Sequence, residues 1–392
     1  MAAALEGICV FDASAGVAGP YAAHLLSLAG ADVIKVEPPQ GEWGRIIGRK
    51  AGTLGLPFLT FNRGKRSLAI DLKHPEGREL ARHVAGRCDV VVESFRPGVM
   101  DRLGLGYEAL GAGRPDLVYL SISGFGTRGP HADRPALDTV IQAQSGWLDL
   151  LRDVGGAPVL MEYVPIDVLT GLYAAQAAMT ALISRFRFGE GRRIDISLLE
   201  AAAAFLAPKL TEAALLPPAT SLQVGVPTGI FPAADGLIAL AIKDDREFGQ
   251  LAQALGHPEW PADARFATRA ARGEHRTECE RAVVAALKRR TAAQWDADLA
   301  RAGIVAAKVN TVRELLDDPH FKALDRIGWN AQPGLGDTPC VRVPGQEDAA
   351  APLHAPAAGE HSREILADMG IDADRIASAV AGGIVRIAEQ AA

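Results

Sequence analysis

Two aspartates, Asp138 and Asp167, stand where apolar patterns of helical period begin, and a carboxylate in that place could act as a nucleophile or an acid–base group. The free N–H groups and the dipole of a helix start stabilise such a charge. Helix starts also line the ligand crevice of parallel α/β folds. Alternatively, both aspartates are ordinary N-terminal caps, a role in which Asp is common. The local sequence leaves both interpretations open.

The pattern after Asp167 predicts a long helix that packs closely against a neighbour. Apolar residues recur with helical period from Leu172 to Leu182, and four alanines lie between Tyr173 and Met179. Small side chains allow close approach, so we expect this helix in the core, with its first turn at a crevice.

The elements that must position these aspartates resemble a parallel, doubly wound sheet. Residues 7–37 show a strand, a glycine loop, a helix opened by Pro20 and a second strand that ends at Glu37. Further strands are expected at 67–72, 89–92 and 117–123. The loop lacks the spacing of a dinucleotide site. The predicted fold class is therefore α/β.

A second domain is expected after residue 215. The composition changes between 215 and 228, where prolines interrupt any period. Residues 225–325 then show a hairpin pattern around Asp235 and Gly236, followed by amphipathic helices. This predicts a large domain at 1–215 and a small α+β domain at 225–325.

Composition narrows the class of protein. The formal charge of −6 does not favour nucleic acid or an anionic membrane as partner. We see no secretory signal and no apolar run long enough to span a bilayer. The four cysteines are scattered, which argues against a zinc site and suits reduced thiols in the cytoplasm.

Five segments follow one another along the chain: LLSLAGADVIKVEPPQG, NRGKRSLAIDLK, ESFRPGVMDRLGLGYEAL, SISGFGTRGP and GRRIDISLLEA. In this order they resemble the class III CoA-transferase family, which includes formyl-CoA, carnitine and succinyl-CoA transferases and α-methylacyl-CoA racemases. The resemblance implies a Rossmann-like large domain that takes up residues 326–392 again after the inserted small domain. It also implies an interlocked homodimer and a CoA thioester as substrate, with no metal and no nucleotide cofactor.

The resemblance assigns the nucleophile to Asp167 and implies a second catalytic or substrate-orienting role for Asp138, for which a structural cap stays the alternative. It places CoA against a set of loop and basic residues: Ala15, Gly16, Val17, Lys65, Arg66, Ser94, Phe95 and Arg102. Lys65 and Arg66 also fit a solvated basic turn. The implied reaction transfers CoA from an acyl-CoA to a carboxylic acid through an aspartyl anhydride and an aspartyl-CoA thioester.

Two other activities stay open at this point. Racemases of the family carry a His before the aspartate at the Asp138 position, where this chain has Leu137, and leucine cannot move an α-proton. A non-catalytic CoA-thioester-binding homologue is the third alternative. The glycine-rich lid of some formyl-CoA transferases is replaced at 221–232 by a stretch that includes LQVGVPTGIF.

The substrate prediction rests on arginines. Arg45, Arg49 and Arg134 could hold a second carboxylate by forked hydrogen bonds, or could be surface or CoA-phosphate contacts. The first interpretation predicts succinyl-CoA as donor and a short dicarboxylate such as itaconate as acceptor.

Overall fold

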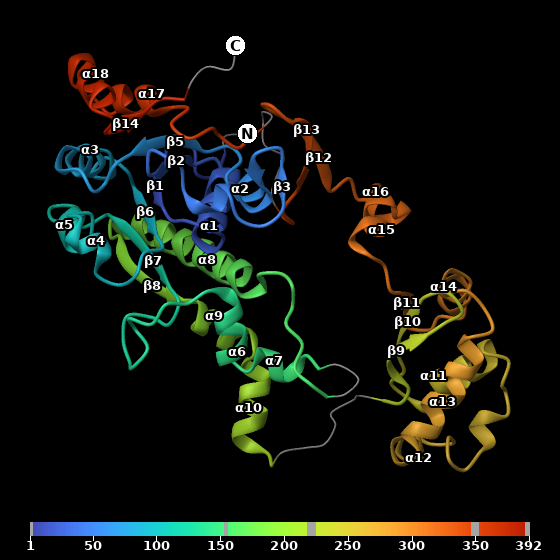
Figure 1. Cartoon of the computed structure of the whole chain (residues 1–392). Coiled ribbons are helices and arrows are strands. Elements are labelled where there is room, and N and C mark those ends of the chain that lie inside the picture. Colours follow the sequence, from blue (N-terminus) through green and yellow to red (C-terminus); the bar gives the residue numbers. More distant parts are fainter. Residues whose placement is uncertain (1–2, 153–155, 218–224, 346–352, 389–392) are drawn as a thin grey trace. The chain divides into compact units, whose positions relative to one another are not determined.

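The computed structural model describes residues 3–152, 156–217, 225–345 and 353–388 (Figure 1). The chain divides into two compact units, Met1–Glu212 with Arg326–Ala392, and Ala213–Asp325.

A seven-stranded sheet forms the centre of the first unit, in the order β14-β5-β2-β1-β6-β7-β8. The strands are β1 (Cys9–Ala13), β2 (Asp32–Glu37), β5 (Arg66–Ile70), β6 (Val90–Glu93), β7 (Val118–Ser123), β8 (Arg192–Ser197) and β14 (Val385–Arg386). All neighbours are parallel except β14, which runs antiparallel to β5. The strand order reverses between β1 and β6, and ligands bind at such a switch point in open parallel sheets.

Helices cover both faces of this sheet because its strands are apolar on both sides. Val10 contributes to one core while its neighbour Phe11 contributes to the other. The first core includes α1 (Ala18–Leu28), α8 (Pro165–Phe188) and α9 (Leu198–Phe205). The second includes α3 (Pro75–Ala85), α4 (Val99–Arg102), α5 (Tyr107–Gly111), α17 (Ser362–Asp368) and α18 (Ala373–Ala381). The prediction of a mixed α/β fold with a parallel sheet is confirmed.

Helix α8 corrects one expectation. By length and composition it could cross a membrane, which contradicts the absence of any such run predicted from the sequence. Its small residues Ala174, Ala175 and Ala178 are buried in the first core. A Cβ on Gly171 would lie only 2.9 Å from the carbonyl oxygen of Ala18 in α1. This close packing is that of a core helix.

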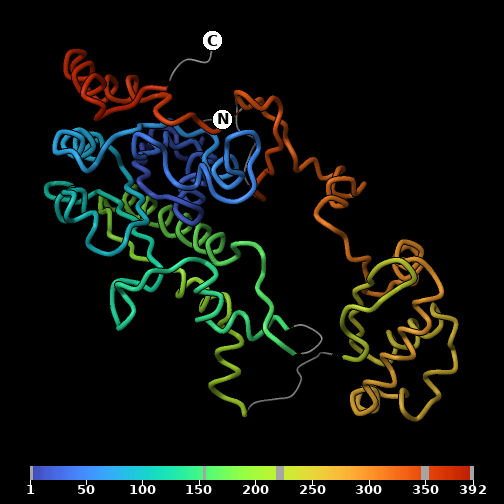
Figure 2. The backbone as a smooth tube through the Cα atoms, in the orientation of Figure 1, coloured from blue at the N-terminus to red at the C-terminus, as the bar shows by residue number. Residues whose placement is uncertain are grey.

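The last part of the chain returns to the edge of the sheet (Figures 1 and 2). It forms the hairpin of β12 (Ile327–Gln332) and β13 (Gly336–Val341), and later α17, α18 and β14. Val385 of β14 pairs with Ile70 of β5. Shorter elements of the unit are β3 (Lys50–Ala51), β4 (Leu54–Gly55), α2 (Leu56–Phe61), α6 (Asp138–Gln144) and α7 (Trp147–Leu150). Helix α10 (Ala207–Leu215) contains the boundary between the two units.

The second unit is a small α+β structure with its own core. Strands β9 (Thr228–Pro232), β10 (Leu237–Ala241) and β11 (Ala306–Lys308) form an antiparallel sheet. The core joins Phe231, Ile238 and Leu240 to α11 (Asp245–Ala254), α13 (Arg276–Leu287) and α14 (Ala292–Arg301). The hairpin predicted around Asp235 and Gly236 is confirmed. Part of the stretch predicted at 221–232 to replace a lid, residues 221–224, lies outside the described residues.

The arrangement of cysteine and acidic side chains bears on whether a metal ion could bind. All four cysteines are free, although the Sγ atoms of Cys9 and Cys88 lie 3.0 Å apart. Within the described ranges, no group of three or more His, Cys, Asp or Glu side chains is arranged to hold a metal ion.

Candidate active site

Asp167 lies in the first turn of α8, two residues after Pro165, and faces a cavity of about 120 Å³. In the part of the chain that the structure describes, no donor or cation pairs with its carboxylate. The cavity is lined by Ala15, Val17, Ala18, Trp43, Ser94, Ile122, Ser123, Gly124, Ala136, Leu137, Asp167 and Leu198. A carboxylate of this kind is available for a reaction with whatever enters the cavity.

Asp138 begins α6 but does not cap its own helix. Its Oδ2 accepts hydrogen bonds from the backbone N–H groups of Ile166 at 2.8 Å and Asp167 at 2.9 Å, and its Oδ1 accepts one from Gln142 Nε2 at 2.6 Å. The side chain is buried and does not line the cavity. Asp138 therefore fixes the first turn of α8 and so positions Asp167.

The surroundings of Asp167 disfavour its charge. Burial and, as a second cause, the negative charge of Asp138 together raise the pKa of the Asp167 carboxyl to about 7. Asp138 also takes up two N–H groups that would otherwise stabilise a carboxylate at the start of α8. A carboxylate that is weakly stabilised is a better nucleophile, and at neutral pH a large share of it is ionised.

Helix starts surround the cavity. Its lining includes Ala18 at the start of α1, Leu137 before α6, Asp167 in α8 and Leu198 at the start of α9. The amino end of a helix carries partial positive charge and free N–H groups. Although burial and Asp138 disfavour a charge on Asp167 itself, the positive ends of these helices would stabilise an oxyanion that forms elsewhere in the cavity during acyl transfer.

A larger groove of about 790 Å³ adjoins this cavity and shares Ala15 and Trp43 with it. It follows the carboxyl ends of β1, β2 and β5 and is closed on the other side by Phe95, Val99 and Leu103. Ala15 and Phe95 were predicted to bind a ligand, whereas Trp43 and Lys73 were missed. The predicted strand ends could have indicated that residues near them, such as Lys73, line a ligand site, because ligands bind beyond the carboxyl ends of parallel strands.

The loop at residues 14–17 separates cavity and groove and is held from two sides. Ser94 Oγ accepts a hydrogen bond from Ala15 N at 2.9 Å, and the Glu42 carboxylate accepts one from Gly16 N at 3.2 Å. Gly16 has a φ of 83°, and a Cβ there would lie 2.5 Å from the Trp43 ring. The predicted residues Ala15, Gly16, Val17 and Ser94 thus come together in one wall.

The structure does not bring Lys65 or Arg66 to this wall. Lys65 Nζ is buried and donates to Asp12 Oδ2 at 2.8 Å, Asn62 Oδ1 at 2.9 Å and the Pro20 carbonyl at 2.9 Å. Burial lowers the pKa of Lys65 to about 8. Arg66 begins β5, at the amino end of that strand, and pairs with three carboxylates, those of Asp32, Glu364 and Asp368.

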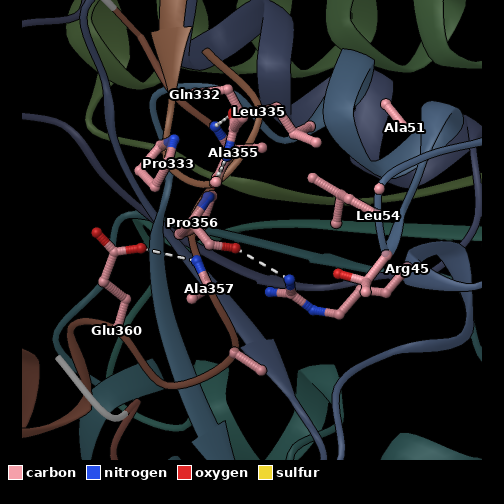
Figure 3. Close-up of a pocket in the computed structure, with 14 residues that line it drawn as sticks. Arg45, Ala51, Leu54, Gln332, Pro333, Leu335, Ala355, Pro356, Ala357 and Glu360 are labelled. Carbon is pink, nitrogen blue, oxygen red and sulfur yellow. Dashed lines mark hydrogen bonds between the residues drawn. The ribbon is translucent and has the colours of Figure 1, made fainter. Parts of the chain in front are cut away.

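The predicted substrate arginines also separate. Arg45 donates to both oxygens of Glu37, at 2.7 and 2.6 Å, and to the Pro356 carbonyl at 3.0 Å. It lines a different cavity of about 370 Å³ between the segment 51–54 and the returning chain (Figure 3). Arg49 lines none of these cavities, and Arg102 ends the helix α4 beside the groove. Arg134 alone of the three lies next to the Asp167 cavity, in a neighbouring cavity.

Comparison with known protein families shows that the sequence model of CoA-transferase family III matches residues 5–362. The chain belongs to this family. It is similar to the succinyl-CoA–D-citramalate CoA-transferase of Chloroflexus aurantiacus, with 35% identity over 95% of this chain and 96% of the relative. It is also similar to the succinate–glutarate CoA-transferase of Agrobacterium fabrum, with 34% identity over 93% of this chain and 95% of the relative.

The family also fits the fold. A solved CaiB/BaiF family protein from Brucella suis superposes with a TM-score of 0.83 and 34% identity, over 93% of this chain and 98% of that one. The protein is therefore a CoA-transferase of family III, and the predicted family resemblance is confirmed. None of the described residues that line the Asp167 cavity is a histidine.

Proposed function

We propose that the protein transfers CoA from succinyl-CoA to a short dicarboxylic acid, of which itaconate is one candidate, with Asp167 as the nucleophile. The observation that carries the proposal is the unpaired Asp167 carboxylate among helix starts, next to a groove large enough for much of a CoA molecule. Relatives named for succinyl-CoA with citramalate and for succinate with glutarate support the substrate class.

The proposed reaction conserves the thioester. The Asp167 carboxylate attacks the thioester carbonyl, the C–S bond breaks, and a mixed anhydride and CoA thiolate form. The thiolate then attacks the Asp167 carbonyl of the anhydride, which releases the donor acid and leaves an aspartyl-CoA thioester. The acceptor carboxylate attacks that thioester, and the returning thiolate attacks the acceptor's carbonyl, which restores Asp167.

The neighbouring residues have supporting roles in this proposal. Asp138 positions Asp167 and keeps its charge weakly stabilised. N–H groups at the helix starts stabilise the tetrahedral oxyanions. The groove takes the nucleotide end of CoA, with Lys73 as a cation in its lining and Arg102 beside it. The interlocked homodimer and the cytoplasmic location stay predictions.

The test is intermediate trapping with mass spectrometry. The enzyme is incubated with succinyl-CoA, quenched, and digested, and we expect a CoA adduct on the peptide that contains Asp167. A panel of mono- and dicarboxylic acids, analysed for new acyl-CoAs, identifies the acceptor. Asp167→Asn should lose adduct and product, whereas Asp149→Asn, on the exposed helix α7, serves as the control. Product formation by Asp167→Asn at the wild-type rate would refute the assignment.

A further inference from the structure

A second small cavity adjoins the one that Asp167 faces. It has a volume of about 130 Å³ and lies between the loops after β6 and β7. Ser94, Ser123, Gly124 and Ala136 line both cavities, so the two share one wall. An engineered cavity of about 150 Å³ in another protein holds one benzene ring, so this one has room for roughly six heavy atoms.

The shared wall is thin because of a glycine. A Cβ on Gly124 would lie 2.2 Å from the Cβ of Ala136, which no side chain could tolerate. Gly124 therefore lets the segment before α6 approach the end of β7. Gly124 and Ala136 thus form part of the wall between the cavity that Asp167 faces and the second cavity.

The second cavity is cationic. Arg96 and Arg134, both exposed, are its charged lining residues, and none of the described residues that line it is acidic. Across the described residues neither guanidinium forms an ion pair. Arg134 makes one long hydrogen bond, from Nη1 to Gln144 Oε1 at 3.4 Å, and lies 5.5 Å from the centre of the Phe125 ring. This contrasts with Arg45, whose donors are occupied by Glu37 and Pro356.

We propose that this cavity binds the distal carboxylate of a short dicarboxylic acid while the other carboxylate reacts at Asp167. Arg96 and Arg134 pair with the distal carboxylate, in the forked geometry that guanidinium and carboxylate groups favour. The inference rests on the proposed function and adds to it the residues that select the substrate. The size of the cavity favours acids of about four or five carbons, because longer chains exceed its room.

The experiment compares glutarate with pentanoate, which has the same carbon chain but lacks the second carboxylate. Each acid is used as acceptor with succinyl-CoA, in wild type, Arg134→Met and Arg96→Met. Methionine keeps an unbranched apolar stem and removes the charge. We expect KM for glutarate to rise roughly 10- to 100-fold, as the loss of a charged hydrogen bond predicts, and KM for pentanoate to stay within about twofold. If pentanoate reacts too slowly, its inhibition constant against glutarate replaces KM.

Two controls separate the explanations. Arg128→Met removes an exposed arginine of the same loop that lines neither cavity, and its constants should match wild type. The Kd for free CoA should not change in Arg96→Met or Arg134→Met. A raised Kd would show that the arginines hold CoA phosphates and would overturn the inference, as would equal effects on both acids. If wild type exchanges no acid at all, the proposed function itself fails.

Discussion

At the scale of single residues, the pair of Asp138 and Asp167 divides one task between two similar side chains. Asp138 is buried and saturated with hydrogen bonds, so it serves as a fixed anchor. Asp167 faces a cavity, and its carboxylate has no hydrogen-bond or ion-pair partner among the described residues. The sequence alone could not make this distinction, because both aspartates precede apolar helical patterns. The difference arises because the fold brings Asp138 within hydrogen-bonding distance of the backbone of Asp167, which lies 29 positions further along the chain.

The charge of Asp138 should appear in the pH dependence of the reaction. Because the nucleophile must be ionised and the pKa of Asp167 is raised to about 7, kcat/KM for the acyl-CoA should rise with pH through that region. In Asp138→Asn the amide oxygen can still accept from the backbone while the charge is gone, so the midpoint should move to lower pH. An unchanged midpoint would show that burial alone sets the pKa.

The control for that profile is Glu93, because burial also raises the pKa of its carboxyl to about 7. Glu93, at the end of β6, accepts hydrogen bonds from Phe95 N at 2.7 Å and from the hydroxyl of Ser121 in β7. Glu93→Gln should leave the midpoint in place. A shift in Glu93→Gln would assign the titration to Glu93.

The ionisation of Asp167 also predicts a stability effect of opposite sign to most carboxyls. Its pKa is about 7 in the folded protein and near 3.8 when unfolded, so the folded state binds the extra proton. The contribution of this group to stability is full below about pH 3.8, falls as the pH rises between these values, and is lost above about 7. Asp167→Asn should therefore raise Tm above pH 7 and change it little at acid pH. Thermal unfolding across pH measures this, and an equal change at all pH values would contradict it.

At the scale of elements, the strands were predictable and many ion pairs were not. The apolar run Val90 to Val92 within the predicted strand 89–92 indicates a strand buried on both faces, and β6 lies there, at Val90–Glu93. The arginine and lysine contacts depend on distant parts of the chain. Arg45 meets Pro356, 311 positions away, and Lys65 meets Asp12 across 53. Such contacts leave no local pattern, so Lys65 could not be told from a solvated basic residue.

Two adjacent basic residues at the start of β5 give a matched test of this distinction. Lys65→Ala removes the nearer of two buried cations and leaves Asp12, beneath the loop that carries Ser14, with Lys35 at 3.9 Å as its remaining ion-pair partner, so unfolding should cost up to about 3–5 kcal/mol less. Arg66→Ala breaks pairs with three half-exposed acids and should cost about 1 kcal/mol or less. Denaturant unfolding measures both. If both variants lost the same small amount of free energy of unfolding, Lys65 would not stabilise the fold and would be assigned to ligand binding instead.

At the scale of the whole molecule, each unit has its own core, and this limits how far a substitution acts. The core of Ala213–Asp325 contains Phe248, Trp260 and Trp295 and includes no residue of the sheet that positions Asp167. Substitutions in one core should therefore change the stability of that unit first. The site that the described residues form around Asp167 belongs wholly to the first unit.

Separate cores predict that residues 225–325 fold alone. A segment of about 100 residues with one hydrophobic core is within the usual size of a domain. Its buried Arg272 is satisfied inside the segment, by the Val226 and Phe266 carbonyls at 2.7 and 2.9 Å and by Asp245 at 2.9 Å. The isolated segment should unfold cooperatively on heating, followed by circular dichroism. Arg272→Met should lower its stability by about 1–3 kcal/mol, because two buried carbonyl groups lose their donor. A segment without a cooperative transition would show instead that its core needs the rest of the chain.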